Sequence, residues 1–133
     1  MTGEFRRLAG SSLVRSVVAG LAGFVGYGGW AFYVNSPHGV SVGARSGLVQ
    51  GSYSMVLTFS TTWIMEFLHD RLSRTGHEVP LTIVIVAVLL FMTAYTINYI
   101  AGTPEILATI TPGFIIGMVY TTVYVVSLNR LKS

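Results

Sequence analysis

Four long stretches of this chain contain no Asp, Glu, Lys or Arg. They are residues 16–44, 46–65, 79–104 and 106–129. Each can hold the roughly 20 apolar residues that a helix needs to cross the hydrocarbon core of a bilayer. Only 10% of the residues are charged and 52% are hydrophobic, whereas a soluble domain carries about 25% charged residues. The sequence therefore predicts an all-α integral membrane protein.

We expect four transmembrane helices in one domain that covers residues 1–133. The charge-free stretches place them at about residues 13–35, 43–68, 79–100 and 105–128. The first stretch is too long for the apolar core of a signal peptide, so we expect it to be retained as a helix. Short loops rich in Gly and Pro follow the first and third helices, at 35–39 and 101–104. Short loops join antiparallel neighbours, so the four helices should form two antiparallel hairpins.

Basic residues are distributed unequally between the two sides that four spans would define. One side would hold Arg6, Arg7, Arg15, Arg71, Arg74, Arg130 and Lys132, and the other only Arg45. The positive-inside rule then predicts that both termini are cytoplasmic, N-in and C-in. We expect the inner (cytoplasmic) membrane of a bacterium as the location.

Small residues follow one face of the second predicted helix at alternating three- and four-residue steps: Ala44, Gly47, Gly51, Ser54, Thr58, Thr61 and Met65. Bulky residues such as Phe59 and Trp63 lie on the other face. Small faces let helix backbones approach closely in lipid. We therefore expect helix packing at Gly23 and Gly26, at Gly47 and Gly51, and at Gly113 and Gly117. This packing is either within one bundle or between subunits, and the last pair is the better candidate for a partner.

Polar residues in the predicted spans are candidates for a pathway or ligand-binding surface: Gln50, Tyr53, Ser54, Thr58, Glu66 and Asn98. An alternative is that they only bond neighbouring helices or, for hydroxyls, their own helix carbonyls. Near the interfaces we expect Glu66 to pair with Arg15, and Glu105 with Arg45. Pro112 should kink the fourth helix or end its first turn, unless a neighbour satisfies the carbonyl that it leaves free.

Several classes of protein are disfavoured by residue content. The chain has no cysteine, and its three histidines lie in predicted loops without metal-ligand spacing on one helix face. No nucleophile–base arrangement is apparent, so we expect no enzyme activity, no metal and no cofactor. The sequence pI of about 9.5 comes without a basic run, which disfavours nucleic acid as a partner.

Two functions of different class remain open. In the first, the protein is an oligomeric transporter, channel or lipid-substrate translocator, because a chain this small needs symmetry to complete a pathway. In the second, it is a non-catalytic accessory or scaffold subunit that docks on a larger membrane complex through its small-residue faces. The spacing Gly47-x-x-x-Gly51 also resembles Gly113-x-x-x-Gly117, which hints at a parallel repeat of the two hairpins.

Overall fold

The computed structural model describes the backbone of residues 2–132 and the side chains of residues 14–131. Its elements are α1 (Thr2–Asn35), α2 (Val40–Leu72), α3 (Glu78–Ile100) and α4 (Ile106–Lys132). Short 3-10 turns, Ser36–His38 and Ser73–Thr75, follow α1 and α2. No strand occurs within residues 2–132, so the predicted all-α class is confirmed.

Three of the helices are longer than predicted at a polar end. The clearest case is α1, which begins at Thr2 and not near residue 13. Charge-free stretches mark only the part of a helix that suits lipid, whereas helical hydrogen bonding continues into polar residues. Each connection contains one glycine with positive φ, namely Gly39, Gly76 or Gly102, because glycine adopts this conformation without a steric penalty.

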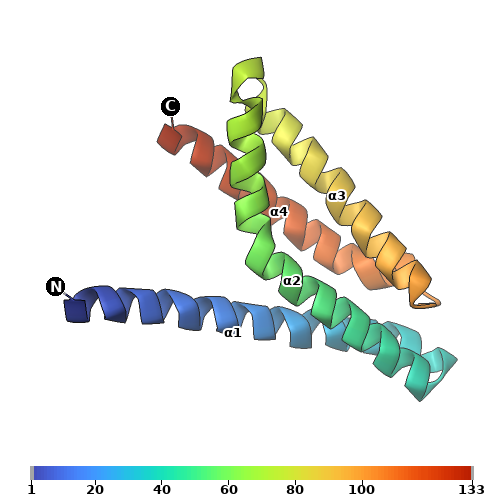
Figure 1. The fold of residues 1–133 in the computed structure, drawn as a ribbon. Coiled ribbons are helices and arrows are strands. Elements are labelled where there is room, and N and C mark those ends of the chain that lie inside the picture. The colour runs from blue at the N-terminus through green and yellow to red at the C-terminus, as the bar shows by residue number, and fades with distance from the viewer. Residues whose placement is uncertain (1, 133) are drawn as a thin grey trace.

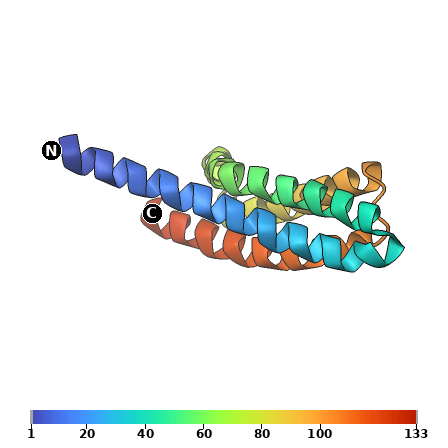
Figure 2. The ribbon, with the colours of Figure 1, turned by 90° about the horizontal axis from the view of Figure 1, so that it is seen from below.

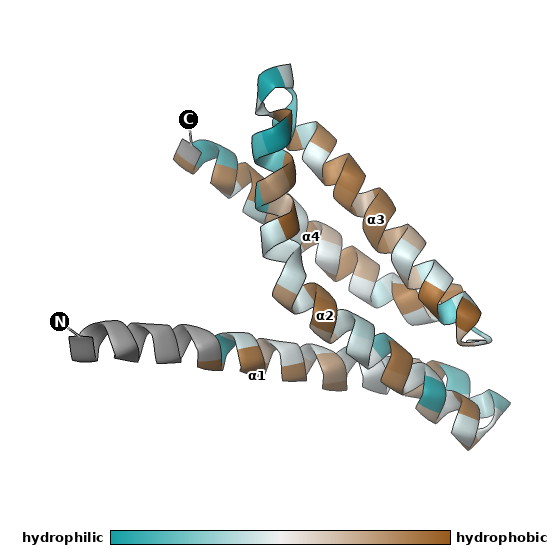
Figure 3. Ribbon diagram, in the orientation of Figure 1, coloured by the Kyte–Doolittle hydropathy of each residue, from teal (hydrophilic) through white to brown (hydrophobic). Residues whose placement is uncertain are grey.

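Of the four predicted transmembrane helices, three have the length and composition that a membrane span requires. The segments Val14–His38, Glu78–Ile100 and Ile106–Leu131 are long and apolar enough to cross a membrane. Helix α2 is long enough but is not apolar enough by composition, and Figure 3 shows polar positions along much of its length. Several of its Gly and Ser residues, among them Gly47, Gly51 and Ser54, are buried.

Helix α2 lies between α1 and the pair formed by α3 and α4 (Figure 1). It contacts α1, α3 and α4, whereas α1 and α3 share no contact among the described residues. Its first half packs against α1, and about half-way along it changes direction and leaves α1 (Figure 1). Helix α1 contacts α4 near the loop end of the molecule, and seen from below it extends beyond the other helices at its N-terminal end (Figure 2).

Backbone contact between α1 and α2 depends on glycines. A Cβ atom added at Gly47 would lie 2.9 Å from the carbonyl oxygen of Gly28, and one at Gly51 would lie 2.9 Å from that of Phe24. On the opposite face of α2, Phe59 and Trp63 are 53% and 68% exposed. The predicted division of α2 is therefore confirmed in part, because the small side faces protein at Gly47 and Gly51 while Trp63 points outward. Ala44 and Thr58 on the small side are exposed, and the Phe59 ring lies 3.0 Å from a Cβ atom added at Gly20 of α1.

Two expectations about glycine packing need correction. Gly26 faces away from the rest of the chain, since a Cβ added there would meet nothing within 4 Å. Gly113 and Gly117 face inward and not toward a partner, because their nearest neighbours are Tyr27 and Leu90 of the same chain. The reason is the position of α4, whose small-residue face turns toward the centre of the bundle.

Candidate functional site

A cavity of about 300 Å³ lies where the four helices meet. Helix α2 supplies most of its polar wall, with Gln50, Tyr53, Ser54 and Thr58, and α4 supplies Gly113 and other residues. The remaining lining is mainly aliphatic and aromatic, and no charged residue lines the cavity. Such a combination of apolar walls and few polar groups is typical of small-molecule sites.

The cavity owes its shape to the bend in α2. Thr58 donates to the carbonyl oxygen of Ser54 at 2.8 Å, Ser60 to that of Val56 at 2.8 Å, and Thr61 to that of Leu57. Hydroxyls that bond the carbonyl four residues back bend helices. Beyond the bend α2 leaves α1, and the cavity occupies the space that results. Rim residues Ile116 and Tyr120 are 55% and 48% exposed, so the cavity opens to the side.

Gln50 has the most informative hydrogen bonding of the lining residues. Its side chain is only 3% exposed. Its Oε1 atom accepts a hydrogen bond from Asn98 Nδ2 at 2.8 Å. Among the described residues, its Nε2 atom has no hydrogen-bond partner, and it lies in the part of the cavity next to Gly113. Gln50 therefore presents a free hydrogen-bond donor to the cavity.

Behind Gln50, a buried polar chain extends to the loop between α3 and α4. Asn98 Nδ2 also donates to the carbonyl oxygen of Ala94 at 2.9 Å, and Asn98 Oδ1 accepts from Thr103 Oγ1 at 3.0 Å. Ser46 Oγ donates to Thr103 Oγ1 at 3.3 Å. These bonds join α2 to the end of α3, so they satisfy the polar groups and also fix the orientation of the Asn98 amide.

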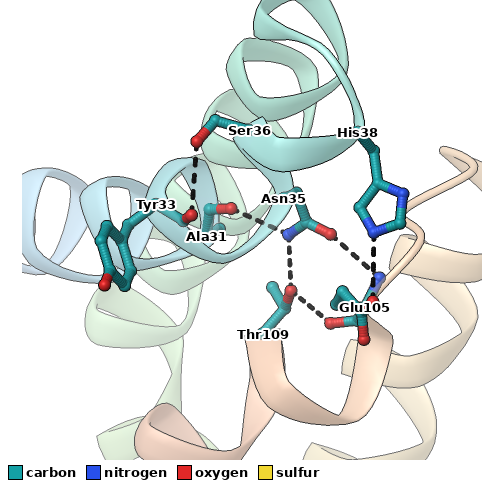
Figure 4. Close-up of polar contacts among 7 residues, drawn as sticks. All are labelled: Ala31, Tyr33, Asn35, Ser36, His38, Glu105 and Thr109. Atoms are coloured by element: carbon teal, nitrogen blue, oxygen red, sulfur yellow. Dashed lines mark hydrogen bonds and ion pairs between the residues drawn. The ribbon is translucent and has the colours of Figure 1, made fainter.

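A second buried asparagine joins the two hairpins at the same end of the molecule (Figure 4). Asn35 Nδ2 donates to the carbonyl oxygen of Ala31 at 2.8 Å and to Thr109 Oγ1 at 2.7 Å. Asn35 Oδ1 accepts from the backbone N–H of Glu105 at 2.9 Å. The side chain of α1 thus caps a free N–H group where α4 begins. His38 Nε2 lies 3.1 Å from Glu105 Oε1 above this contact (Figure 4).

The predicted interfacial ion pairs do not form among the described side chains. Glu66 accepts a hydrogen bond from the Tyr124 hydroxyl at 2.9 Å and not from Arg15. Glu105 interacts with His38, while Arg45 Nη2 lies 3.5 Å from the carbonyl oxygen of Gly102. The sequence predicts these pairs only from similar positions along two helices. The angles at which the helices cross bring other partners closer.

Four of the six predicted pathway residues line the cavity, and two do not. Gln50, Tyr53, Ser54 and Thr58 are in its wall. Asn98 lies behind Gln50 and acts on the cavity only through it. Glu66 lies beyond the cavity, at the end where α2 and α4 approach again. Tyr53 donates to the carbonyl oxygen of Leu90 at 3.2 Å. For Tyr53, the structure therefore shows the predicted alternative, a hydrogen bond between neighbouring helices.

Sequence reasoning missed the contributions of α1 and α4 to the cavity. Tyr27 and Tyr120 line it, but nothing in their sequence context separates them from the other aromatic residues of the spans. Gly113, which the sequence predicts as a packing residue, also lines the cavity, where an added Cβ atom would be in ordinary contact with Tyr27 and Gln50. The described residues contain no group of three or more His, Asp or Glu that could hold a metal ion.

Comparison with known proteins identifies no relative of this chain. No protein-family model, no curated protein and no solved structure matches it. A functional argument therefore has to start from the cavity and its donor.

Proposed function

We propose that this protein is a four-span membrane transporter that works as an oligomer and takes up its solute in the central cavity. The observation that carries the proposal is the amide nitrogen of Gln50. This residue is only 3% exposed, and its nitrogen borders the cavity and has no hydrogen-bond partner among the described residues. An amide group without a partner is costly in an apolar environment. A purely structural helix gains stability by satisfying it, whereas a transporter needs it for its solute.

The ends of α2 support its role as the fourth span. Near one end Ser46 bonds Thr103, just before α4, and at the other end His69 Nε2 lies 3.1 Å from Asn129 Oδ1 on α4. Helix α2 is therefore held against α4 at both ends, and a bilayer crossed by α4 would be crossed by α2 as well. With four spans, the excess of basic residues at the termini and middle loop favours N-in, C-in in an inner membrane.

The oligomeric part of the proposal follows from the open side of the cavity. One chain leaves Ile116 and Tyr120 exposed at the rim, so a second copy would supply the missing wall.

One observation favours the alternative function, a non-catalytic subunit of a larger membrane complex. The N-terminal part of α1 extends past the other helices (Figure 2), and its Val14, Val17 and Val18 side chains are exposed. A helix segment with exposed apolar side chains is available to a partner protein. The transporter function requires the Gln50 amide for solute accumulation, whereas the accessory-subunit function does not.

Substitution of Gln50 by Leu tests the choice between them. Cells that produce the wild type should differ at least twofold from cells that produce Gln50→Leu in steady-state accumulation of Nile red, an uncharged apolar dye. Both forms should be present at equal amounts in the membrane and have the same oligomeric mass on gel filtration with light scattering. Equal accumulation in both strains and in an empty-vector control, with Gln50→Leu equally or more stable, would support the accessory-subunit function.

A further inference from the structure

The hydrogen-bonding direction of Gln50 is fixed from outside the cavity. A backbone carbonyl only accepts hydrogen bonds, so the bond with Ala94 requires Asn98 to turn its Nδ2 atom toward α3 and α2. The same Nδ2 then donates to Gln50, which must offer its Oε1 atom. The Nε2 atom of Gln50 is left for the cavity. The Gln50 amide therefore keeps its donor nitrogen, and not its acceptor oxygen, toward the cavity as long as Asn98 keeps its orientation.

The rest of the lining excludes a charged ligand. No Asp, Glu, Lys, Arg or His is among the lining residues, and an ion without a counter-charge is unstable in such surroundings. The open rim at Ile116 and Tyr120 lies near the middle of α4, which would place it among acyl chains. A molecule that enters from there has to be soluble in hydrocarbon.

Space is available directly beside the donor. Residue 113 is glycine, and a Cβ atom added there would lie 3.8 Å from Gln50 Nε2 and 3.6 Å from the Tyr27 ring. A group about the size of a methyl could therefore lie between the Gln50 amide and α4, such as the carbonyl oxygen of a ligand whose remaining atoms lie in the cavity. A side chain larger than alanine at residue 113 would occupy this volume.

We propose that the cavity binds an uncharged, mainly apolar molecule that carries a hydrogen-bond acceptor such as a carbonyl oxygen, and that Gln50 Nε2 donates a hydrogen bond to this acceptor. Asn98 is the positioning residue that fixes the direction of the donor. This inference rests on the proposed function, because it names the solute class for the same cavity.

The test uses two rigid competitors that differ only at one group, fluorenone with a carbonyl and fluorene with a methylene. The full-length protein is placed in phosphatidylcholine nanodiscs and irradiated with benzophenone, an uncharged photoreactive ketone. Labelled residues are then located by peptide mass spectrometry. We expect labelling of cavity residues of α2 and α4, and fluorenone should suppress it at about five- to tenfold lower concentration than fluorene, which corresponds to one buried hydrogen bond.

Three variants connect this preference to the named residues. Gln50→Met keeps the side-chain length and should remove the difference between the two competitors. Asn98→Leu should weaken the difference while cavity labelling persists, a result that a purely structural role would not produce. Gly113→Leu should abolish cavity labelling. Labelling at outward-facing Val84 and Val88 of α3 should be the same in every form and serves as the internal control.

Three results would overturn the inference: no cavity labelling in the wild type, equal competition by fluorenone and fluorene, or an unchanged preference in Gln50→Met. The wild-type comparison needs no variant, so the inference stays testable if a variant fails to fold. Binding with a fluorenone preference but no effect on Nile red accumulation would refute transport and leave the ligand class intact. Nile red transport without a preference for fluorenone would refute the ligand class and leave transport intact.

Discussion

The indole Nε1 of Trp30 donates a hydrogen bond to the carbonyl oxygen of Ala108 at 2.8 Å. This carbonyl is the one that Pro112 leaves free, because proline lacks the N–H group that would bond four residues back. Helix α4 continues through Pro112 as a result. Of the outcomes that the sequence left open at Pro112, a neighbour that satisfies the carbonyl is the one observed.

Replacing Trp30 by Phe should therefore lower the stability of the protein by ~1 kcal/mol, because an acceptor loses its partner. The cost should largely disappear in a Pro112→Ala background, where the backbone N–H of residue 112 can reach the Ala108 carbonyl. Unfolding of all four forms by SDS titration in detergent measures the coupling. Equal costs of Trp30→Phe in both backgrounds would show that the indole acts only through its packing.

Substitution of Gly47 by Ala should destabilise the α1–α2 contact by about 1–3 kcal/mol, since the added methyl group would meet the Gly28 carbonyl and a backbone must shift. Gly26→Ala is the matched control on the open face of α1. It should leave stability unchanged or raise it by about 0.5–1 kcal/mol, as alanine favours helix. The same SDS titration reports both. Equal effects of the two substitutions would contradict the packing described for Gly47.

The contact between Asn35 and α4 should be as sensitive as a core position. Asn35→Ala removes the acceptor for the Glu105 N–H and the donor to Thr109. We expect a loss of about 1–3 kcal/mol, because Thr109 is buried and the Glu105 N–H is part-buried. Ser36→Ala, which removes only a bond to the Tyr33 carbonyl, should cost much less. Thermal unfolding followed by circular dichroism distinguishes them, and similar losses would argue against the cap.

Cysteine labelling tests the number of membrane crossings directly, because the natural chain has no cysteine. A membrane-impermeant maleimide should label Pro37→Cys in intact bacterial cells or spheroplasts. It should label His77→Cys only after the membrane is permeabilised. Both residues are exposed and lie in opposite loops of α2. If the two cysteines react from the same side, α2 does not cross the bilayer and the proposed topology is wrong.

Gly113→Ala tests the cavity wall beside Gln50 with a smaller change than Gly113→Leu. Its methyl group would meet Tyr27 and Gln50 at ordinary contact distances, so stability should change by less than about 1 kcal/mol. The cavity beside the Gln50 donor would become smaller, and fluorenone should compete with benzophenone two- to fivefold less well, by roughly the worth of a lost apolar contact. Unchanged competition would place the ligand elsewhere in the cavity.

The sequence by itself determined the helical class, the approximate positions of the four helices and the division of α2 into a small and a bulky face. These follow from charge-free length and residue spacing, which depend only on local geometry and on the cost of charge in lipid. It also indicated Gln50, Tyr53, Ser54 and Thr58, because polar groups are conspicuous in apolar stretches.

Only the tertiary structure decided which polar groups meet. The sequence predicts a pair between Glu66 and Arg15 because both lie at similar positions along their helices. The crossing of α2 and α4 instead brings Tyr124 to Glu66. The bend of α2 creates the cavity, and the chain from Ala94 through Asn98 determines which end of the Gln50 amide faces it. Such results depend on the angles between helices and on hydrogen bonds between residues 48 positions apart, and no local pattern in the sequence encodes either.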